Sequence, residues 1–244
     1  MAVNALPAFA ESEGGTSGWS GTYAGAFAGA GRPDNRIVDV DGFADWGNPG
    51  SRTSYAGAGA VGGLLVGKRF GIGGVRFRVE ADAMFGDLSA STNRLDPGCT
   101  DEVASSRFRW IATVRVGVEE TIGGVGVFVS GGPALARIVN SVTDTDYSGS
   151  TCLERDLRLD ADDSFRRGST EVGWAIGAGF EMPLAARWAL RVDGSYLDFG
   201  GETYRVNLSG NNSCGPGGAR TACRYTVRNR LGVVRLGIVY RFGE

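Results

Sequence analysis

The amino-acid sequence predicts an all-β protein, an eight-stranded antiparallel up-and-down β-barrel whose strands cross a membrane. Three observations support this prediction. Apolar and polar residues alternate one by one over several segments, which is the side-chain period of a β-strand. Glycine makes up 41 of the 244 residues, a content that weakens helices and suits turns and close strand contacts. The connections between the alternating segments are long and short in turn, as in a barrel with loops at one end and tight turns at the other.

Composition excludes several classes of function. Lys and Arg number 25 against 27 Asp and Glu, so the net charge of −2 provides no basic field for nucleic acid. The chain has 0 histidines, which removes Ser/His and Cys/His nucleophile pairs and the commonest metal ligand. It contains no apolar run of about 18 residues, so a transmembrane helix is not expected, whereas a membrane-spanning strand needs only about 9–11 alternating residues.

The N-terminus resembles the end of a secretory signal. Residues 1–10 finish in Ala-Phe-Ala, a small-x-small cleavage pattern that makes Glu11 the first mature residue. An ordinary flexible N-terminus is the alternative. Residues 11–18 are expected to be a flexible lead-in, and residues 19–244 the barrel.

The first two predicted strands are rich in glycine and alanine. Residues 18–31 form the first, and a long polar loop with several turn-forming residues follows over 32–54. A second strand is predicted over 55–68, and a short connection over 69–74 leads to the third.

The next two strands carry the clearest alternation. Over residues 75–85, apolar side chains alternate with arginines and carboxylates, so charged residues line one face. A loop is predicted over 89–104, followed by a fourth strand over 107–118 with the same arrangement.

The second half of the chain repeats this pattern after a short turn over 119–124. Its predicted elements are a strand over 125–138, a long loop over 140–168, a hairpin over 171–200 with its turn at 183–187, a long loop over 201–224 and a last strand over 225–242. The prediction is therefore four long extracellular loops and three short periplasmic turns.

The apolar face is predicted to contact lipid and the charged face to line the lumen. The candidates for an aromatic girdle, all on apolar faces near predicted strand ends, are Trp110, Trp174, Trp188, Tyr196 and Tyr240. The predicted lumen charges are Arg76, Arg78, Glu80, Asp82, Arg107, Arg109, Arg115, Glu119, Glu171, Glu181, Arg191, Asp193 and Arg235. They can line a selective pore or form a filled interior of salt bridges. The filled interior is favoured because eight strands enclose only enough room for their own side chains.

Several segments resemble strands of the small alphaproteobacterial outer-membrane β-barrel proteins, within the OmpA-like "porin family" of surface antigens. The matching segments are SGTYAGAFAG (20–29), WIATVRVGV (110–118), VFVSGGPALA (127–136), GWAIGAGFEMPLAARWALRVDGSYLDFG (173–200) and VVRLGIVYRF (233–242). The predicted long loops carry none of the resemblance. Two features depart from the family pattern: two residues follow the terminal Phe242, and the predicted loops contain four cysteines.

The cysteines Cys99, Cys152, Cys214 and Cys223 all fall in predicted loops. An even number in an exported protein suggests two disulfides. Cys214 and Cys223 are close enough in sequence to staple one loop, which would leave Cys99 for Cys152, but three connectivities remain open. A four-cysteine zinc site is the alternative, and no C-x2-C spacing supports it.

No catalytic, cofactor-binding or metal site is predicted. Asp144 and Asp146, and the group Asp160, Asp162 and Asp163, have a spacing that can bind calcium, but the glycine and distal glutamate of an EF-hand loop are missing. The glycine-rich residues 57–63 precede no helix and no GK[ST], which argues against a phosphate-binding loop.

The resemblance implies a non-enzymatic protein of the bacterial outer membrane with a structural, surface-exposed role in envelope integrity, adhesion or antigenicity. The implied partners are outer-membrane lipid, lipopolysaccharide and a cell-surface or envelope protein, whereas nucleic acid and cofactors are not expected. The oligomeric state is not predicted. The alternatives are a narrow porin for small solutes or ions, a soluble ligand-binding barrel with its faces reversed, and an outer-membrane lipid-modifying enzyme.

Overall fold

The computed structural model describes residues 20–42, 49–95, 100–146, 159–207 and 222–243. The predicted signal remnant and lead-in lie outside this part of the chain. Among the described residues, no helix has the length and hydropathy to span a bilayer. The strands are β1 (Gly21–Asp39), β2 (Arg52–Ala56), β3 (Gly59–Ile72), β4 (Val75–Leu95), β5 (Thr100–Ile122), β6 (Val125–Asp146), β7 (Leu159–Ala185), β8 (Trp188–Asn207) and β9 (Ala222–Phe242).

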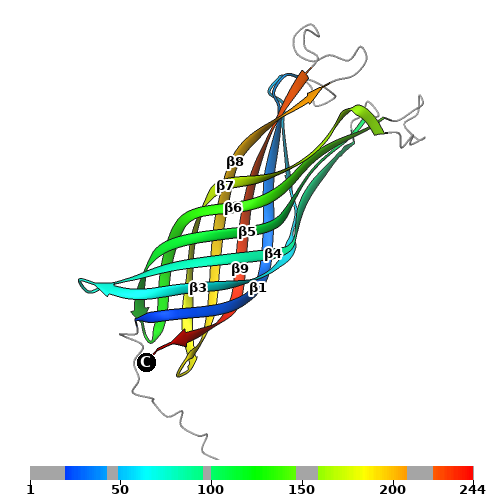
Figure 1. Ribbon diagram of the computed structural model, residues 1–244. Helices are drawn as coiled ribbons and strands as arrows, with labels where there is room; N and C mark the ends of the chain where they lie inside the picture. Colours follow the sequence, from blue (N-terminus) through cyan, green and yellow to red (C-terminus); the bar gives the residue numbers. More distant parts are fainter. Residues whose placement is uncertain (1–19, 43–48, 96–99, 147–158, 208–221, 244) are drawn as a thin grey trace, which may run out of the picture.

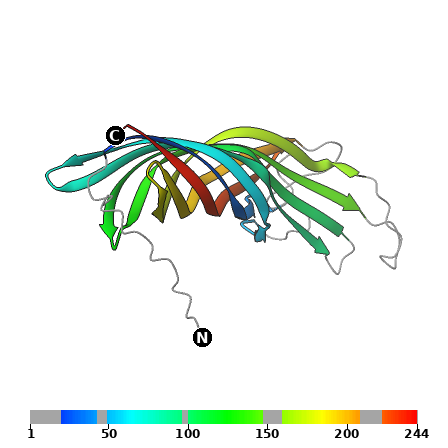
Figure 2. The ribbon, with the colours of Figure 1, turned by 90° about the horizontal axis from the view of Figure 1, so that it is seen from below.

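The strands close into one elongated barrel, and they are tilted relative to its long axis (Figures 1 and 2). Each strand pairs antiparallel with its neighbour, and β1 also pairs with β9 from Thr22 opposite Phe242 to Asp39 opposite Tyr225. This pairing closes the described sheet on itself along the length of β1, and closure is the condition for a sheet to cross lipid.

The predicted eight-stranded up-and-down barrel is confirmed, with its second strand interrupted. Both β2 and β3 pair with β1, and Gly57 and Ala58 separate them. The Gly57 amide still donates to the Pro33 carbonyl at 3.1 Å, so the contact with β1 continues across the break. Nine strand segments therefore occupy eight positions around the barrel.

The tight turns lie at the end of the barrel where β1 starts and β9 finishes (Figure 1). Gly73 and Gly74 join β3 to β4, and Gly123 and Gly124 join β5 to β6. All four have positive φ, between 58° and 84°. Two consecutive residues with positive φ form the type I′ turn, which matches the twist of paired strands and which glycine adopts without steric cost. The short connections are thus tighter than predicted.

The strands are also longer than predicted at the opposite end. Much of the predicted loops over 32–54, 89–104, 140–168 and 201–224 is strand, because β1, β4, β5, β6, β7, β8 and β9 all extend into them. These extensions carry polar or small residues on their outer face, as in β4 where Ser89 and Ser91 are exposed. Because their outer face has no apolar row, the extensions lack the lipid-facing pattern in the sequence.

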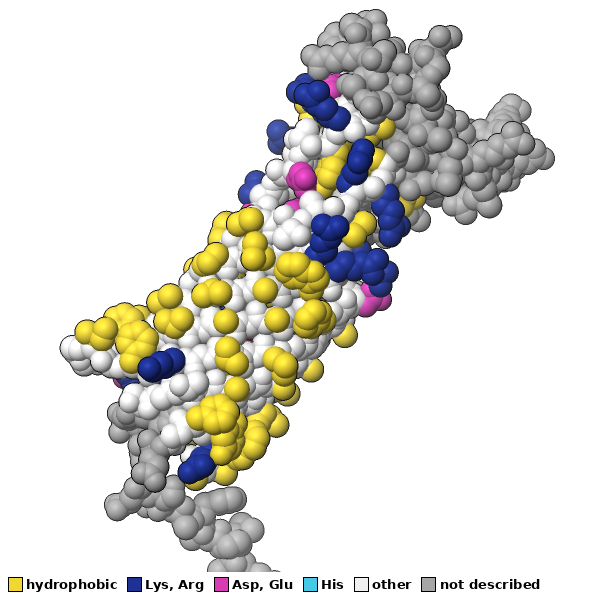
Figure 3. Space-filling view, in the orientation of Figure 1, with side chains coloured by type: hydrophobic (Ala, Val, Ile, Leu, Met, Phe, Trp, Pro, Cys, Tyr) yellow, Lys and Arg dark blue, Asp and Glu magenta, His cyan; other side chains and the backbone are white. Residues whose placement is uncertain are grey.

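The outer face of the barrel has an apolar zone and a charged zone (Figure 3). The exposed large apolar side chains include Leu64, Val66, Val79, Phe85, Val114, Val116, Val118, Val127, Val129, Val172, Ile176, Val234, Leu236 and Ile238. They lie on the half of the barrel nearer the tight turns. A band of this kind on the outside of a closed barrel is the surface that contacts lipid.

A β-bulge in β5 reverses the orientation of two predicted lumen residues. The register of β5 against β6 shifts between Phe108 and Trp110. The extra residue changes the alternation, because a bulge adds one residue to one strand only. Phe108 is therefore buried, and Arg107 and Arg109 are exposed on the outer surface. The prediction that these two arginines face the lumen is wrong.

Candidate functional site in the barrel lumen

The lumen is filled by side chains that form four layers along the barrel axis. The inward row of β9 shows the order: Arg235 is followed by Val233 and Leu231, then by Asn229, then by Val227. From the tight-turn end, the interior thus passes from a charged layer through an apolar layer to a polar layer and a second apolar layer.

The charged layer contains five arginines and five carboxylates that are buried and paired with one another. They are Arg69, Arg78, Arg115, Arg191 and Arg235 with Glu80, Asp82, Glu119, Glu181 and Asp193. The formal charges of these ten side chains cancel, and the buried Arg241 adds one further positive charge beside Glu119 and Glu181. Buried charges persist in a protein when they are paired and hydrogen-bonded in this way.

Glu80 on β4 is the centre of this layer. Its carboxylate accepts hydrogen bonds from Arg78 Nη2 at 3.0 Å, from Arg115 Nη2 at 2.8 Å and from both terminal nitrogens of Arg191, of which Nη2 is 2.9 Å away. The Tyr23 hydroxyl donates to the same carboxylate at 2.9 Å. One carboxylate thus connects side chains from β1, β4, β5 and β8.

Asp193 and Asp82 neutralise the arginine from the last strand. Arg235 Nη2 lies 2.6 Å from Asp193 Oδ2, and Arg235 Nη1 lies 3.2 Å from Asp82 Oδ1. Thr113 donates a further hydrogen bond to Asp82 at 2.7 Å. These contacts tie β9 to β4, β5 and β8 across the lumen.

Aromatic rings fill the space that the ion pairs leave. The guanidinium carbon of Arg78 lies 3.8 Å from the centre of the Phe128 ring, and that of Arg235 lies 4.5 Å from the Phe27 ring. Cation–π contacts of this kind stabilise arginines that have lost their water. The inward face of β3 has glycine where rings of β1 pack against it. A Cβ on Gly67 would approach the Tyr23 ring to 2.4 Å.

An apolar layer separates the charged layer from the other end of the barrel. Phe108 and Phe199 pack with their ring centres 5.9 Å apart, and Leu88, Ile111 and Leu231 are buried beside them in the same cluster. A continuous plug of apolar side chains excludes water and ions from this section of the lumen.

A polar layer lies beyond it around Glu171 on β7. Asn229 Nδ2 donates to both carboxylate oxygens of Glu171, at 3.1 and 3.0 Å, and Asn140 Nδ2 donates to one of them at 3.3 Å. Asn140 also donates to the Tyr204 hydroxyl at 2.9 Å and accepts from Ser106 at 2.6 Å. Among the described residues, the hydrogen-bond donors to Glu171 are all neutral.

A second apolar cluster covers the polar layer. Phe165 stacks on Tyr204 with ring centres 5.2 Å apart and lies 5.7 Å from the Tyr225 ring. Ile37 and Val227 are buried in the same cluster. The described part of the lumen is thus closed by apolar side chains at two levels.

Apart from Arg107 and Arg109, the charged residues predicted for the lumen lie there. Arg76 is half-buried at the tight-turn end and bonded to Thr121, and Glu171 belongs to the polar layer. The others are in the charged layer: Arg78, Glu80, Asp82, Arg115, Glu119, Glu181, Arg191, Asp193 and Arg235.

Several members of these layers are not among the predicted lumen residues. Arg69 fell in a predicted connection, although it continues the inward row of β3, and Arg241 is a buried member of the inward row of β9. Asn140 and Asn229 carry no charge, so the rows of charged residues that predict the lumen do not include them. Once the strands are paired, the two-residue spacing from Arg235 identifies Asn229 as inward.

The girdle candidates lie on the outside at two levels. Trp188 and Tyr240 contact each other near the tight turns, with ring centres 4.8 Å apart, and Trp174 and Tyr196 contact each other at 5.6 Å on the other side of the apolar band. Tyr196 follows Trp188 by eight positions on β8, which is roughly 26 Å along a strand.

With strands tilted by about 35–45°, this length spans about 18–21 Å across the membrane, somewhat less than the apolar band of about 25 Å in outer-membrane barrels. Trp110, half-exposed on β5, is paired with the exposed Phe85 of β4. Trp110, Trp174 and Tyr196 were predicted to lie near strand ends. They lie within their strands instead, because the strands continue beyond the apolar band.

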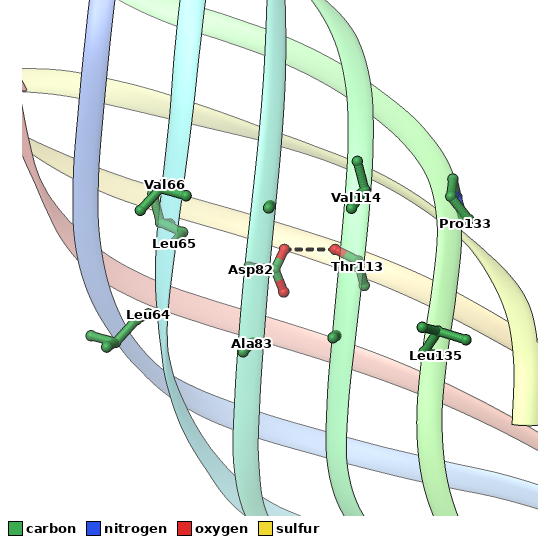
Figure 4. A pocket seen from close by; sticks show the side chains of 11 residues that line it. Leu64, Leu65, Val66, Asp82, Ala83, Thr113, Val114, Pro133 and Leu135 are labelled. Atoms are coloured by element: carbon green, nitrogen blue, oxygen red, sulfur yellow. Dashed lines mark hydrogen bonds between the residues drawn. The ribbon is translucent and has the colours of Figure 1, made fainter. Parts of the chain in front are cut away.

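A groove crosses the apolar band over β3 to β6 (Figure 4). Ala81, Ala83 and Ala112 form a shallow floor between the larger Leu64 and Leu135, and the hollow has a volume of about 370 Å³. It faces the lipid, and the Asp82–Thr113 hydrogen bond belongs to the inner side of the same wall. The groove offers a packing surface for acyl chains and no polar group for catalysis.

The remaining candidates are the four cysteines and the aspartates considered for calcium. Cys223 is buried on β9, so the prediction that no cysteine lies on a strand is wrong for it, whereas Cys99, Cys152 and Cys214 lie outside the described residues. Their pairing stays a prediction. The aspartates considered for calcium lie on β6 and β7, and the orientation of their side chains is outside the description. Within the described ranges, no group of three or more acidic or cysteine side chains is placed to hold a metal ion.

The closed antiparallel ring, the apolar outer band and the polar interior define the class of this protein as a bacterial outer-membrane β-barrel. The chain belongs to the family described as the outer membrane protein beta-barrel domain, whose model matches residues 1–218. No curated protein matches the sequence.

Solved structures of small outer-membrane barrels share the fold. The outer membrane protein OprG from Pseudomonas aeruginosa has a TM-score of 0.50 and 13% identity, over 92% of this chain and 99% of OprG. Neisserial surface protein A has a TM-score of 0.36 and 14% identity, over 89% of this chain and 97% of its own. The outer membrane protease OmpT from Escherichia coli has a TM-score of 0.35 and 9% identity, over 91% and 96%. Likeness at this identity concerns the fold and not the activity.

Proposed function

We propose that this protein is a non-conducting structural barrel that displays its long-loop end at the cell surface. The observation that carries the proposal is the lumen, in which a layer of paired charges and two apolar layers occupy the cross-section. A porin needs a continuous water-filled path, and eight strands are too few to leave one beside packed side chains. Envelope integrity, adhesion or antigenicity at the surface, with an envelope or cell-surface protein as partner, is the role that such a barrel supports. The resemblance to alphaproteobacterial surface antigens points the same way.

The proposal excludes catalysis by the described lumen. The buried carboxylates of the charged layer are engaged by arginines, and Glu171 lies between two apolar layers that keep a substrate out. A hydrolytic site needs an accessible nucleophile beside a base, and the absence of histidine removes the commonest base.

Planar-bilayer recording tests the proposal. The purified, folded protein is added to the bilayer in parallel with an open trimeric porin, reconstituted by the same protocol as a positive control. We expect no reproducible conductance steps from this protein, because both apolar layers must open before ions pass. Regular steps at low protein concentration, abolished by boiling the sample, would show that the barrel is a porin and overturn the proposal.

A further inference from the structure

Arginines dominate the outer surface between the apolar band and the long-loop end (Figure 3). Lys68 lies at the other end of the barrel, and among the residues whose exposure is described, the exposed carboxylates in this zone are Asp34 and Asp87. We call the exposed arginines of the zone the arginine belt: Arg32, Arg36, Arg52, Arg107, Arg109, Arg166, Arg167, Arg205 and Arg228. Among the side chains whose exposure is described, positive charge is in excess, and such an excess attracts anions along the rim of the apolar band.

Part of the belt surrounds a hollow on β1, β2 and β9. The hollow has a volume of about 100 Å³ and is lined by Asp34, Asn35, Arg36, Ser54, Arg228 and Arg230. Three guanidinium groups, one hydroxyl group and one carboxylate thus meet at a concave site on the outer surface.

The pairing of the strands brings like charges together at this hollow. Arg36 on β1 is directly opposite Arg228 on β9, and both side chains are exposed on the same face. Like charges in directly opposite positions destabilise a sheet. An anion between the two guanidinium groups converts this repulsion into attraction, because arginine binds phosphate through two parallel hydrogen bonds.

Neither Asp34, which lines the hollow, nor the nearby Asp198 forms a hydrogen bond or ion pair with Arg36. Asp198 accepts hydrogen bonds from Arg228 Nη2 at 2.8 Å and from Arg230 Nε at 3.2 Å, and it therefore holds these two side chains in place. Arg36 has no hydrogen bond or ion pair with another described side chain. Its guanidinium group is available to a ligand.

The position of the hollow identifies the kind of anion. Tyr196, on the girdle of the long-loop side, is paired with Gly232, which is itself opposite Arg32. Arg230 and Arg228 lie two and four positions further along β9, about 7 and 13 Å along the strand. The hollow is therefore at the level of lipid headgroups, on the side that faces the outer leaflet in barrels of this class.

We propose that this hollow binds a phosphate group of lipopolysaccharide in the outer leaflet, with Arg36 and Arg228 as its principal ligands and Arg230 beside them. The rest of the arginine belt attracts further phosphates around the barrel. This inference goes beyond a structural role and does not depend on whether the lumen conducts.

Native mass spectrometry of the full chain folded in detergent micelles tests the inference. The probes are lipid A with two phosphates and the same lipid after dephosphorylation. We expect the wild-type protein to retain the phosphorylated lipid in preference to the dephosphorylated one. Arg36→Gln should weaken this retention about tenfold, because it removes one bidentate, charge-assisted contact. Arg187→Gln, an exposed change beside the tight turn between β7 and β8, should leave it unchanged.

The remaining outcomes decide against the inference. Equal retention of both lipids, or equal retention by wild type and Arg36→Gln, would show that phosphate is not bound at this hollow. Displacement of the lipid by inorganic phosphate at millimolar concentration would identify a site for free anions. Displacement by a soluble sulfated polysaccharide at concentrations below that of the lipid would identify a soluble polyanion as the ligand.

Discussion

Replacing Glu80 with alanine is expected to lower the free energy of unfolding by roughly 3–5 kcal/mol, the effect of removing one partner from a buried ion-pair network. Glu80 is bonded to Arg78, Arg115 and Arg191, and all three guanidinium groups are almost completely buried. Without this carboxylate, four carboxylates remain for the five arginines of the network and the buried Arg241 beside it. Water compensates the excess charge poorly, because the three guanidinium groups that lose their partner are almost completely out of reach of solvent.

Urea unfolding in phospholipid vesicles measures this effect, with gel mobility before and after boiling to count the folded fraction. Glu120→Ala is the matched control, since Glu120 is adjacent to the network member Glu119 in sequence but exposed. The control should change the unfolding free energy by less than about 0.5 kcal/mol. If both variants behave alike, the lumen is hydrated and the account of a sealed charged layer is wrong.

Placing an arginine in the middle of the apolar band is expected to cost about 2–4 kcal/mol of stability in a bilayer. Val116 on β5 is 56% exposed and lies between Val114 and Val118, midway between Trp110 and the tight turn after Ile122. In Val116→Arg, the guanidinium group faces hydrocarbon and must thin the bilayer or bend toward the headgroups to stay hydrated.

The same unfolding assay checks this second expectation, with two controls. Val116→Leu keeps the side chain apolar, and Ser91→Arg adds the same charge on the exposed face of β4 beyond the band. Both should differ from wild type by no more than about 1 kcal/mol. An equal loss in Val116→Arg and Ser91→Arg would mean that the valine row does not contact lipid.

The sequence was sufficient to predict the strands that carry a strong contrast between their faces. On β4, the row Arg78, Glu80 and Asp82 alternates with Val79 and Ala81, so both the strand and its orientation are visible in a single segment. The order of the eight strands followed from the sorted connections. The lipid-facing side was inferred from the position of tryptophan and tyrosine on the apolar face.

Other features depend on pairing between strands and could not be predicted. The bulge between Phe108 and Trp110 leaves no mark in a sequence that alternates on both sides of it, so Arg107 and Arg109 were placed in the lumen. The polar layer around Glu171 combines uncharged asparagines from distant strands. The strand extensions have no apolar row on their outer face, because that face lies beyond the hydrocarbon, so the lipid-facing pattern does not reveal them.

The central claim is that the apolar face of this barrel contacts lipid, and quenching of tryptophan fluorescence by brominated phospholipids tests it most directly. Three variants, each with a single tryptophan, retain Trp174, retain Trp188 or carry Val116→Trp. We expect bromine near the headgroups to quench Trp174 and Trp188 most strongly, and bromine deep in the acyl chains to quench the tryptophan at position 116 most strongly. Strong quenching of all three by aqueous acrylamide, with no effect of brominated lipid, would contradict the claim.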